Sequence, residues 1–117
     1  MRHRVSTAIA AALFVAVATP ASAQKVVYQG ADAEKLKCAV MLSIVGEIGL
    51  REGELGAGEY MMTTGAIITL LEELPGTPAQ KNQAMDRMAE RLFEGASERD
   101  VARLFERDLP RCDRFFR

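Results

Sequence analysis

The stretch KCAVMLSIVGEIGL, Lys37 to Leu50, decides the fold, because one cysteine heads a long apolar run whose only internal charge is Glu47. Its apolar residues recur at spacings of three and four, which favours a helix over a strand. The run could be a membrane anchor, a reactive-thiol site or half of a disulfide staple. As a helix it spans about 20 Å, short of the roughly 30 Å of a bilayer's hydrocarbon core, so length disfavours the anchor.

Residues 1–23 have the layout of a secretory signal peptide. A basic start precedes an apolar stretch from Val5 to Ala18, and Ala21-Ser22-Ala23 follows, so we expect cleavage before Gln24. A retained membrane helix is the alternative, but the stretch is shorter than the roughly 20 residues that span a bilayer. Cleavage leaves enough chain for one small domain. Its mildly acidic charge predicts no affinity for nucleic acid.

Cys38 and Cys112 are the two cysteines of the chain. We expect them to pair, because disulfides form and persist in the compartments that exported proteins reach. Their separation of 74 residues is unlike a C-x-x-C redox centre, whose reactive thiol depends on a short loop. A regulatory or intermolecular bond remains the alternative. A bridge that closes so long a loop stabilises a domain by about 4 kcal/mol in the chain-entropy model.

The expected mature chain reads as a flexible lead-in at 24–30 and one helical domain at 31–117, with helices at about 33–51, 58–74, 78–94 and 98–109 and a C-terminal tail. Three of these helices have residues that can cap their starts: Asp32, Thr77 with Gln80, and Ser97 with Asp100. Short loops make neighbouring helices antiparallel. We therefore predict an all-α, small four-helix bundle-like domain with one disulfide, in up-down-up-down order.

The only histidine, His3, lies in the predicted signal peptide. Without it, the mature chain can form no Ser-His-Asp or Cys-His arrangement and no histidine-based zinc site. We expect no enzyme activity, no catalytic residue, no metal and no cofactor. Glu47 has apolar neighbours and is either a buried carboxylate tuned by desolvation or, as its spacing favours, a partner of Arg51 four residues on.

Glycines and methionines within the predicted helices have competing explanations. Gly46, Gly49 and Gly65 each cost up to about 1 kcal/mol relative to alanine. We expect them to mark a close approach of the first two helices, with a groove for an apolar ligand or partner helix as the alternative. Met85 and Met88 lie on the apolar stripe of the third helix, which favours core packing over a Cu(I) site.

Arginines recur every four residues along the last helix and its exit: Arg99, Arg103, Arg107 and Arg111. Acids between them favour a solvated mixed surface. The alternative is an anion-binding row for phospholipid headgroups, an acidic envelope polymer or an acidic partner.

These patterns favour an exported protein, periplasmic or extracellular, that binds another envelope protein or itself, as a subunit or in a chaperone-like way. In size, export, helicity and single disulfide the chain is similar to the periplasmic acid-stress chaperones. That likeness implies partial opening at low pH and capture of client proteins. The alternative function is binding of anionic lipid or envelope polymer through the arginine row. We expect no membrane span in the mature protein.

Overall fold

The computed structural model describes residues 25–116, so the predicted signal peptide lies outside the described part of the chain. Within that part there are four α-helices, one 3-10 segment and no strand, which confirms the predicted all-α class. The elements are α2 (Ala31–Arg51), α3 (Ala57–Glu72), α4 (Pro78–Phe93), α5 (Glu98–Asp108) and η2 (Leu109–Phe116). Each predicted helix end lies within about two residues of the observed one, the usual uncertainty of helix boundaries.

Capping boxes start α4 and α5, as predicted. At α4 the Thr77 hydroxyl accepts from the Gln80 backbone N–H at 3.2 Å, and the Gln80 side chain accepts from the Thr77 N–H at 2.9 Å. Ser97 and Asp100 make the same pair of bonds at α5, both at 3.2 Å. Each box satisfies two N–H groups that a helix start leaves without an internal partner.

The predicted cap of the first helix is wrong. The helix begins at Ala31, after Gly30, and no side chain caps it. Gly30 has a φ of 59°, a conformation that glycine reaches at little cost, and it lets the helix start two residues earlier than the sequence indicated. Asp32 therefore lies inside the first turn with Glu34, where the helix dipole favours negative charge.

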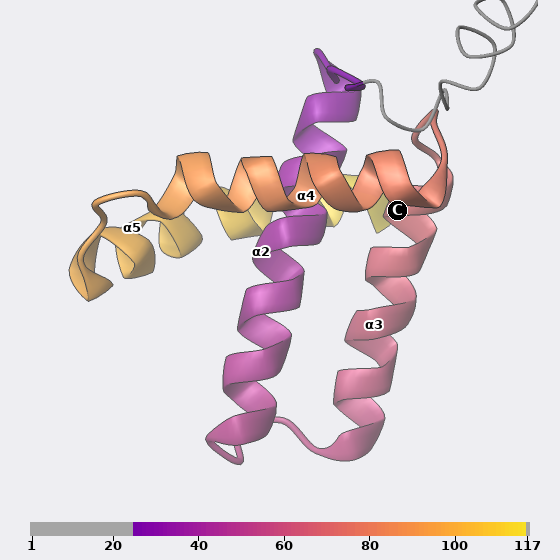
Figure 1. Cartoon of the computed structure of the whole chain (residues 1–117). Helices are drawn as coiled ribbons and strands as arrows, with labels where there is room; N and C mark the ends of the chain where they lie inside the picture. The colour runs from indigo at the N-terminus through magenta and orange to yellow at the C-terminus, as the bar shows by residue number, and fades with distance from the viewer. Residues whose placement is uncertain (1–24, 117) are drawn as a thin grey trace, which may run out of the picture.

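The helices do not follow the expected up-down-up-down order. α2 and α3 lie side by side and antiparallel, but α4 runs across them, and η2 returns to pack on α2 (Figure 1). The turn between α3 and α4 contains Pro75 and Gly76, which has a φ of 111°, and it redirects the chain across the pair. α2 is the central helix, because α3, α4 and η2 all pack on it.

The core lies around the first half of α2. Buried Cys38, Ala39 and Met41 pack with Leu70 of α3 and Cys112 of η2, and partly buried side chains from α4 and α5 complete this cluster. The disulfide Cys38–Cys112 is formed, with the two Cα atoms 5.7 Å apart. It ties the N-terminal half of the central helix to the C-terminal segment, as predicted.

Gly46 marks the expected close approach of α2 and α3, whereas Gly49 lies against the connector between these helices. A Cβ at Gly46 would lie 3.2 Å from the Thr63 methyl group of α3, and one at Gly49 would lie 2.8 Å from the side chain of Leu55 in the connector. Side chains thus fill the space at both positions, where the alternative placed a groove. Gly65 differs, because a Cβ there would meet nothing within 4 Å.

The lead-in before α2 is tied to the domain by two hydrogen bonds that the sequence did not indicate. The Tyr28 hydroxyl donates to the Pro75 carbonyl at 2.6 Å, and Arg87 Nη2 donates to the Val26 carbonyl at 3.2 Å. Burial raises the pKa of Tyr28; Asp32 adds to the rise and Arg87 opposes it. The lead-in therefore lies against the α3–α4 turn and α4.

Candidate functional site

The outward side of α3 is the most unusual surface of the described chain. α3 packs on α2 along one side, and Leu70 is its only buried residue. The opposite side carries Met61, Met62 and Ile68, which are 73%, 77% and 50% exposed. With Gly65 and Thr69 these residues share one helix face by the 3.6-residue period. We call these five residues the α3 outer face.

Charge is absent from this surface. Between Glu59 and Glu72, near the two ends of α3, no residue is charged. α4 and α5 differ, since their exposed positions carry acids and bases such as Glu90, Arg91 and Arg103. The α3 outer face is therefore the one helix side, among residues 25–116, that offers solvent a long uncharged strip.

Thr69 makes the α3 outer face less polar than its side chain suggests, and the other two threonines of α3 form the same kind of hydrogen bond. Each hydroxyl donates to the carbonyl four residues earlier at 3.0 Å: Thr63 to Glu59, Thr64 to Tyr60 and Thr69 to Gly65. A hydroxyl bonded back to its own helix has its donor already used. Such threonines present a methyl group and need no polar partner in an interface.

The four arginines of the predicted row lie in different surroundings. Arg107 is engaged with its neighbour, donating from Nε to Asp108 Oδ1 at 2.8 Å and from Nη2 to Oδ2 at 3.0 Å. Arg111 lies apart from this pair, lining a hollow of about 430 Å³ together with Arg114 and Glu34. Arg99 and Arg103 are exposed on α5. The members of the row therefore have different surroundings, and Arg107 is the one member with an ion pair among the described residues.

Asp108 is the buried ionic group that sequence reasoning missed. Its side chain is 5% exposed, and it accepts from Lys37 Nζ at 2.6 Å as well as from Arg107. The hydrogen bonds from Arg107, helped by Lys37, hold the pKa of Asp108 well below its ordinary value against the opposing effect of burial. This carboxylate joins α2 to the end of α5 beside the disulfide, which gives it a structural role.

Other candidates from the sequence lie in different environments. Glu47 is exposed, so the interpretation as a buried carboxylate is wrong, and no ion pair joins it to Arg51 in the described chain. Met85 and Met88 are partly buried against the core clusters, as predicted. Within residues 25–116, no three acidic, cysteine or histidine side chains gather as a metal-binding group.

No protein-family model matches the chain, and comparison with curated proteins and with solved structures found no match. No helix among residues 25–116 combines the length and apolarity needed to cross a membrane. Geometry and charge of the described residues are therefore the basis of the functional proposal.

Proposed function

We propose that this protein is an exported, non-enzymatic binding protein, and that a partner protein docks on the α3 outer face. The observation that carries the proposal is the exposure of Met61 and Met62, at 73% and 77%, on a helix side without charge. Scattered exposed apolar residues are ordinary, but contiguous exposed apolar surface marks sites of protein interaction.

The composition of the α3 outer face suits a protein partner. Depletion of charge distinguishes the centre of protein interfaces from the rest of a surface, and methionine is enriched there. Methionine also adapts its shape, so surfaces rich in it accept partners of differing contour. Gly65 leaves a flat place between Met61 and Ile68, where the backbone of a partner helix could approach closely. The expected partner is another envelope protein that presents an apolar surface, or a second copy of this chain.

Export is supported by the disulfide and by the N-terminal sequence. Cys38 and Cys112 form a disulfide, and such bonds persist in oxidising compartments such as the periplasm and the extracellular space. The N-terminal sequence supplies the basic start, apolar stretch and small-residue cleavage site of a signal peptide. Both observations agree with a periplasmic or extracellular protein.

Binding of an anionic lipid or envelope polymer through the arginine row is the competing function. Arg107 is a poor contributor to it, since its guanidinium is held by buried Asp108. Arg99, Arg103 and Arg111 are exposed, and charge reversal at Arg99 and Arg103 tests this function without disturbing the ion pair.

The test is a quantitative pull-down with the variant Met61→Glu/Met62→Glu. Placing two carboxylates on the α3 outer face should reduce partner capture from the envelope fraction at least about tenfold, because desolvating unpaired charge in an interface is costly. The melting temperature should stay close to that of the wild type, since both positions are exposed.

Two further variants serve as controls. Asn82→Asp/Gln83→Glu adds the same charge at exposed positions of α4 and should leave capture unchanged. Arg99→Glu/Arg103→Glu should also capture the partner. Undiminished capture by the methionine variant would refute the proposal, and loss of binding to anionic vesicles only in the arginine variant would favour the competing function.

A further inference from the structure

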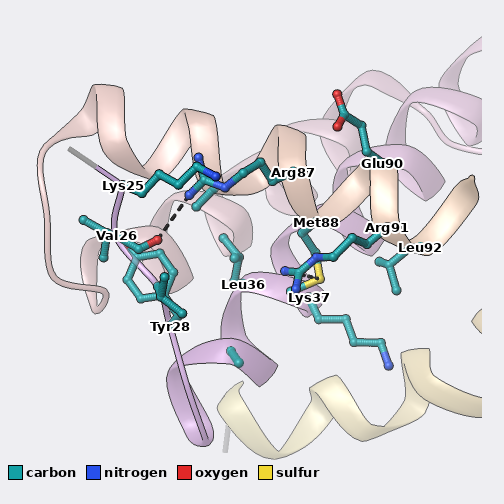
Figure 2. A pocket seen from close by; sticks show the side chains of 13 residues that line it. Lys25, Val26, Tyr28, Leu36, Lys37, Arg87, Met88, Glu90, Arg91 and Leu92 are labelled. Carbon is teal, nitrogen blue, oxygen red and sulfur yellow. Dashed lines mark hydrogen bonds between the residues drawn. The ribbon is translucent and has the colours of Figure 1, made fainter. Parts of the chain in front are cut away.

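A cavity of about 650 Å³ lies between α2, α4 and the lead-in, and no residue of α3 lines it. In Figure 2, Val26 and Tyr28 of the lead-in form one side, and Met88 of α4 faces Leu36 of α2. The hydrogen bond from Arg87 to the Val26 carbonyl holds the lead-in in place as a wall. The volume is within the range of roughly 300–1,000 Å³ that is usual for small-molecule sites.

The floor of the cavity is apolar. Leu36 and Ala84 are each 3% exposed, and Met88 packs against them while also lining the cavity. The small side chains of Ala84 and Ala33 leave the space open where the two helices cross. Such a floor favours a hydrocarbon chain, which gains free energy in proportion to the apolar area removed from water.

The edge of the cavity is positively charged. Its lining includes four bases, Lys25, Lys37, Arg87 and Arg91, and a single acid, Glu90. Figure 2 shows the Glu90 carboxylate turned away from the other side chains.

Three of these four bases lack an acidic partner in the part of the chain that the structure describes. Lys37 is paired with Asp108, whereas Lys25, Arg87 and Arg91 have no ion pair within residues 25–116. Arg87 uses one N–H on the Val26 carbonyl, and a guanidinium has five N–H donors. The edge thus offers several charge-assisted donors beside an apolar floor.

From this combination we propose that the cavity binds a single-chain anionic amphiphile. Its carboxylate or phosphate head lies at Arg87 and Arg91, and its hydrocarbon chain lies on Leu36, Ala84 and Met88. A planar guanidinium binds either head through paired hydrogen bonds. An inorganic anion would leave the floor empty and a neutral lipid would leave the bases without a partner, so only an amphiphilic anion uses both parts. This site is independent of the partner proposed for the α3 outer face.

The test is calorimetric titration and NMR with four probes: decanoate, decanol, acetate and inorganic phosphate. The purified protein is used, with its N-terminus and disulfide established by mass spectrometry. Decanoate should bind saturably to one site and shift the resonances of Leu36, Ala84 and Met88. Decanol, acetate and phosphate should each bind at least about tenfold more weakly, because each lacks the head or the chain.

Matched arginine variants locate the head. Arg91→Gln removes an exposed guanidinium and should weaken decanoate binding by about tenfold, the effect of losing one charge-assisted hydrogen bond to a ligand. Arg87→Gln should weaken it similarly. Arg103→Gln, which removes an exposed arginine outside the cavity, should leave the affinity unchanged.

Several results would overturn the proposal. Equal affinity for decanol and decanoate would make the cavity a purely apolar site, and equal affinity for phosphate would make it an anion site only. Decanoate binding that survives both Arg87→Gln and Arg91→Gln would place the ligand elsewhere. NMR contacts between residues before Lys25 and the cavity residues Leu36 and Met88 are a further such result. If decanoate also caused no shift of these resonances, the chain itself would fill the cavity.

Discussion

α2 and α3 are neighbouring antiparallel helices, both rich in apolar residues, yet they differ sharply in how they are covered. α2 buries seven residues beneath α3, α4 and η2, including Met41 at 1% exposure. α3 is the more apolar of the two and buries one residue. Apolar composition therefore indicates that a helix needs a partner surface, and topology decides whether this chain supplies it. The chain covers α2 with its own helices, but it covers α3 on one side only.

The first test of the comparison removes the disulfide that ties α2 to η2. Cys38→Ser/Cys112→Ser should lower the free energy of unfolding by about 4 kcal/mol, because the bond closes a 74-residue loop and restricts the unfolded chain. Chemical denaturation of the variant and of the reduced wild type checks this. A change below about 1 kcal/mol in both would mean that packing alone fixes α2.

Methionines offer a matched pair on the two helices. Met41→Ala should cost about 2–5 kcal/mol, since it empties a buried core position. Met61→Ala should change stability by less than about 0.5 kcal/mol, because that side chain is 73% exposed. Urea unfolding of both variants measures the contrast, and similar losses would show that α3 is as fully covered as α2.

Acid should weaken the ionic tie between α2 and α5. The depressed pKa of Asp108 means that the ionised carboxylate contributes stability above its unfolded pKa, near 3.9. That contribution is lost as pH falls below this value towards the folded-state pKa. Asp108→Asn should therefore lower the free energy of unfolding at pH 7 by about 1–3 kcal/mol and lessen its decline below about pH 4.

Denaturation of wild type and Asp108→Asn at neutral and acidic pH checks this prediction. Parallel loss of stability in the two proteins below pH 4 would assign the acid response to other groups. The result also bears on the resemblance to acid-stress chaperones, which implies partial opening at low pH. α2 should loosen only under strong acid, whereas the α3 outer face should be exposed already at neutral pH.

Glycines give the smallest and sharpest contrast. Gly65→Ala should raise the free energy of unfolding by about 0.5–1 kcal/mol, because the position is helical and open, so alanine brings only its better helix propensity. Gly49→Ala should instead lower it, since the new methyl group would lie 2.8 Å from Leu55. Thermal unfolding of the two variants tests both signs; a loss of stability at Gly65 would show that α3 is more closely packed there.

Local signals in the sequence predicted much of the fold. The capping boxes at Thr77 and Ser97, the apolar period of α4 and the pairing of Cys38 with Cys112 all agree with the structure. Asp32 was the wrong cap because the helix start depended on the backbone conformation of Gly30. The crossing of α4 was missed because loop length predicts adjacency but does not give the direction that Pro75 and Gly76 impose.

The candidate sites were less predictable, because they depend on contacts between distant residues. Asp108 looked like one acid among the arginines of the last helix, and its burial depends on Lys37, 71 residues earlier. The exposure of Met61 and Met62 could not be predicted either, because it depends on which of the described helices do not pack on α3. α3 would have the same apolar pattern whether other helices covered both of its sides or only one side. The position of α4 decides which of these two arrangements occurs.

Methionine oxidation measures the central claim most directly, because the wild-type chain carries its own probes on both helices. In the isolated protein, limited peroxide treatment followed by peptide mass spectrometry should oxidise Met61 and Met62 readily and spare Met41. In the intact envelope fraction, where the partner is present, oxidation of Met61 and Met62 should fall several-fold while that of Met41 stays low. Equal oxidation of Met61 and Met62 in the two preparations would contradict a partner on the α3 outer face.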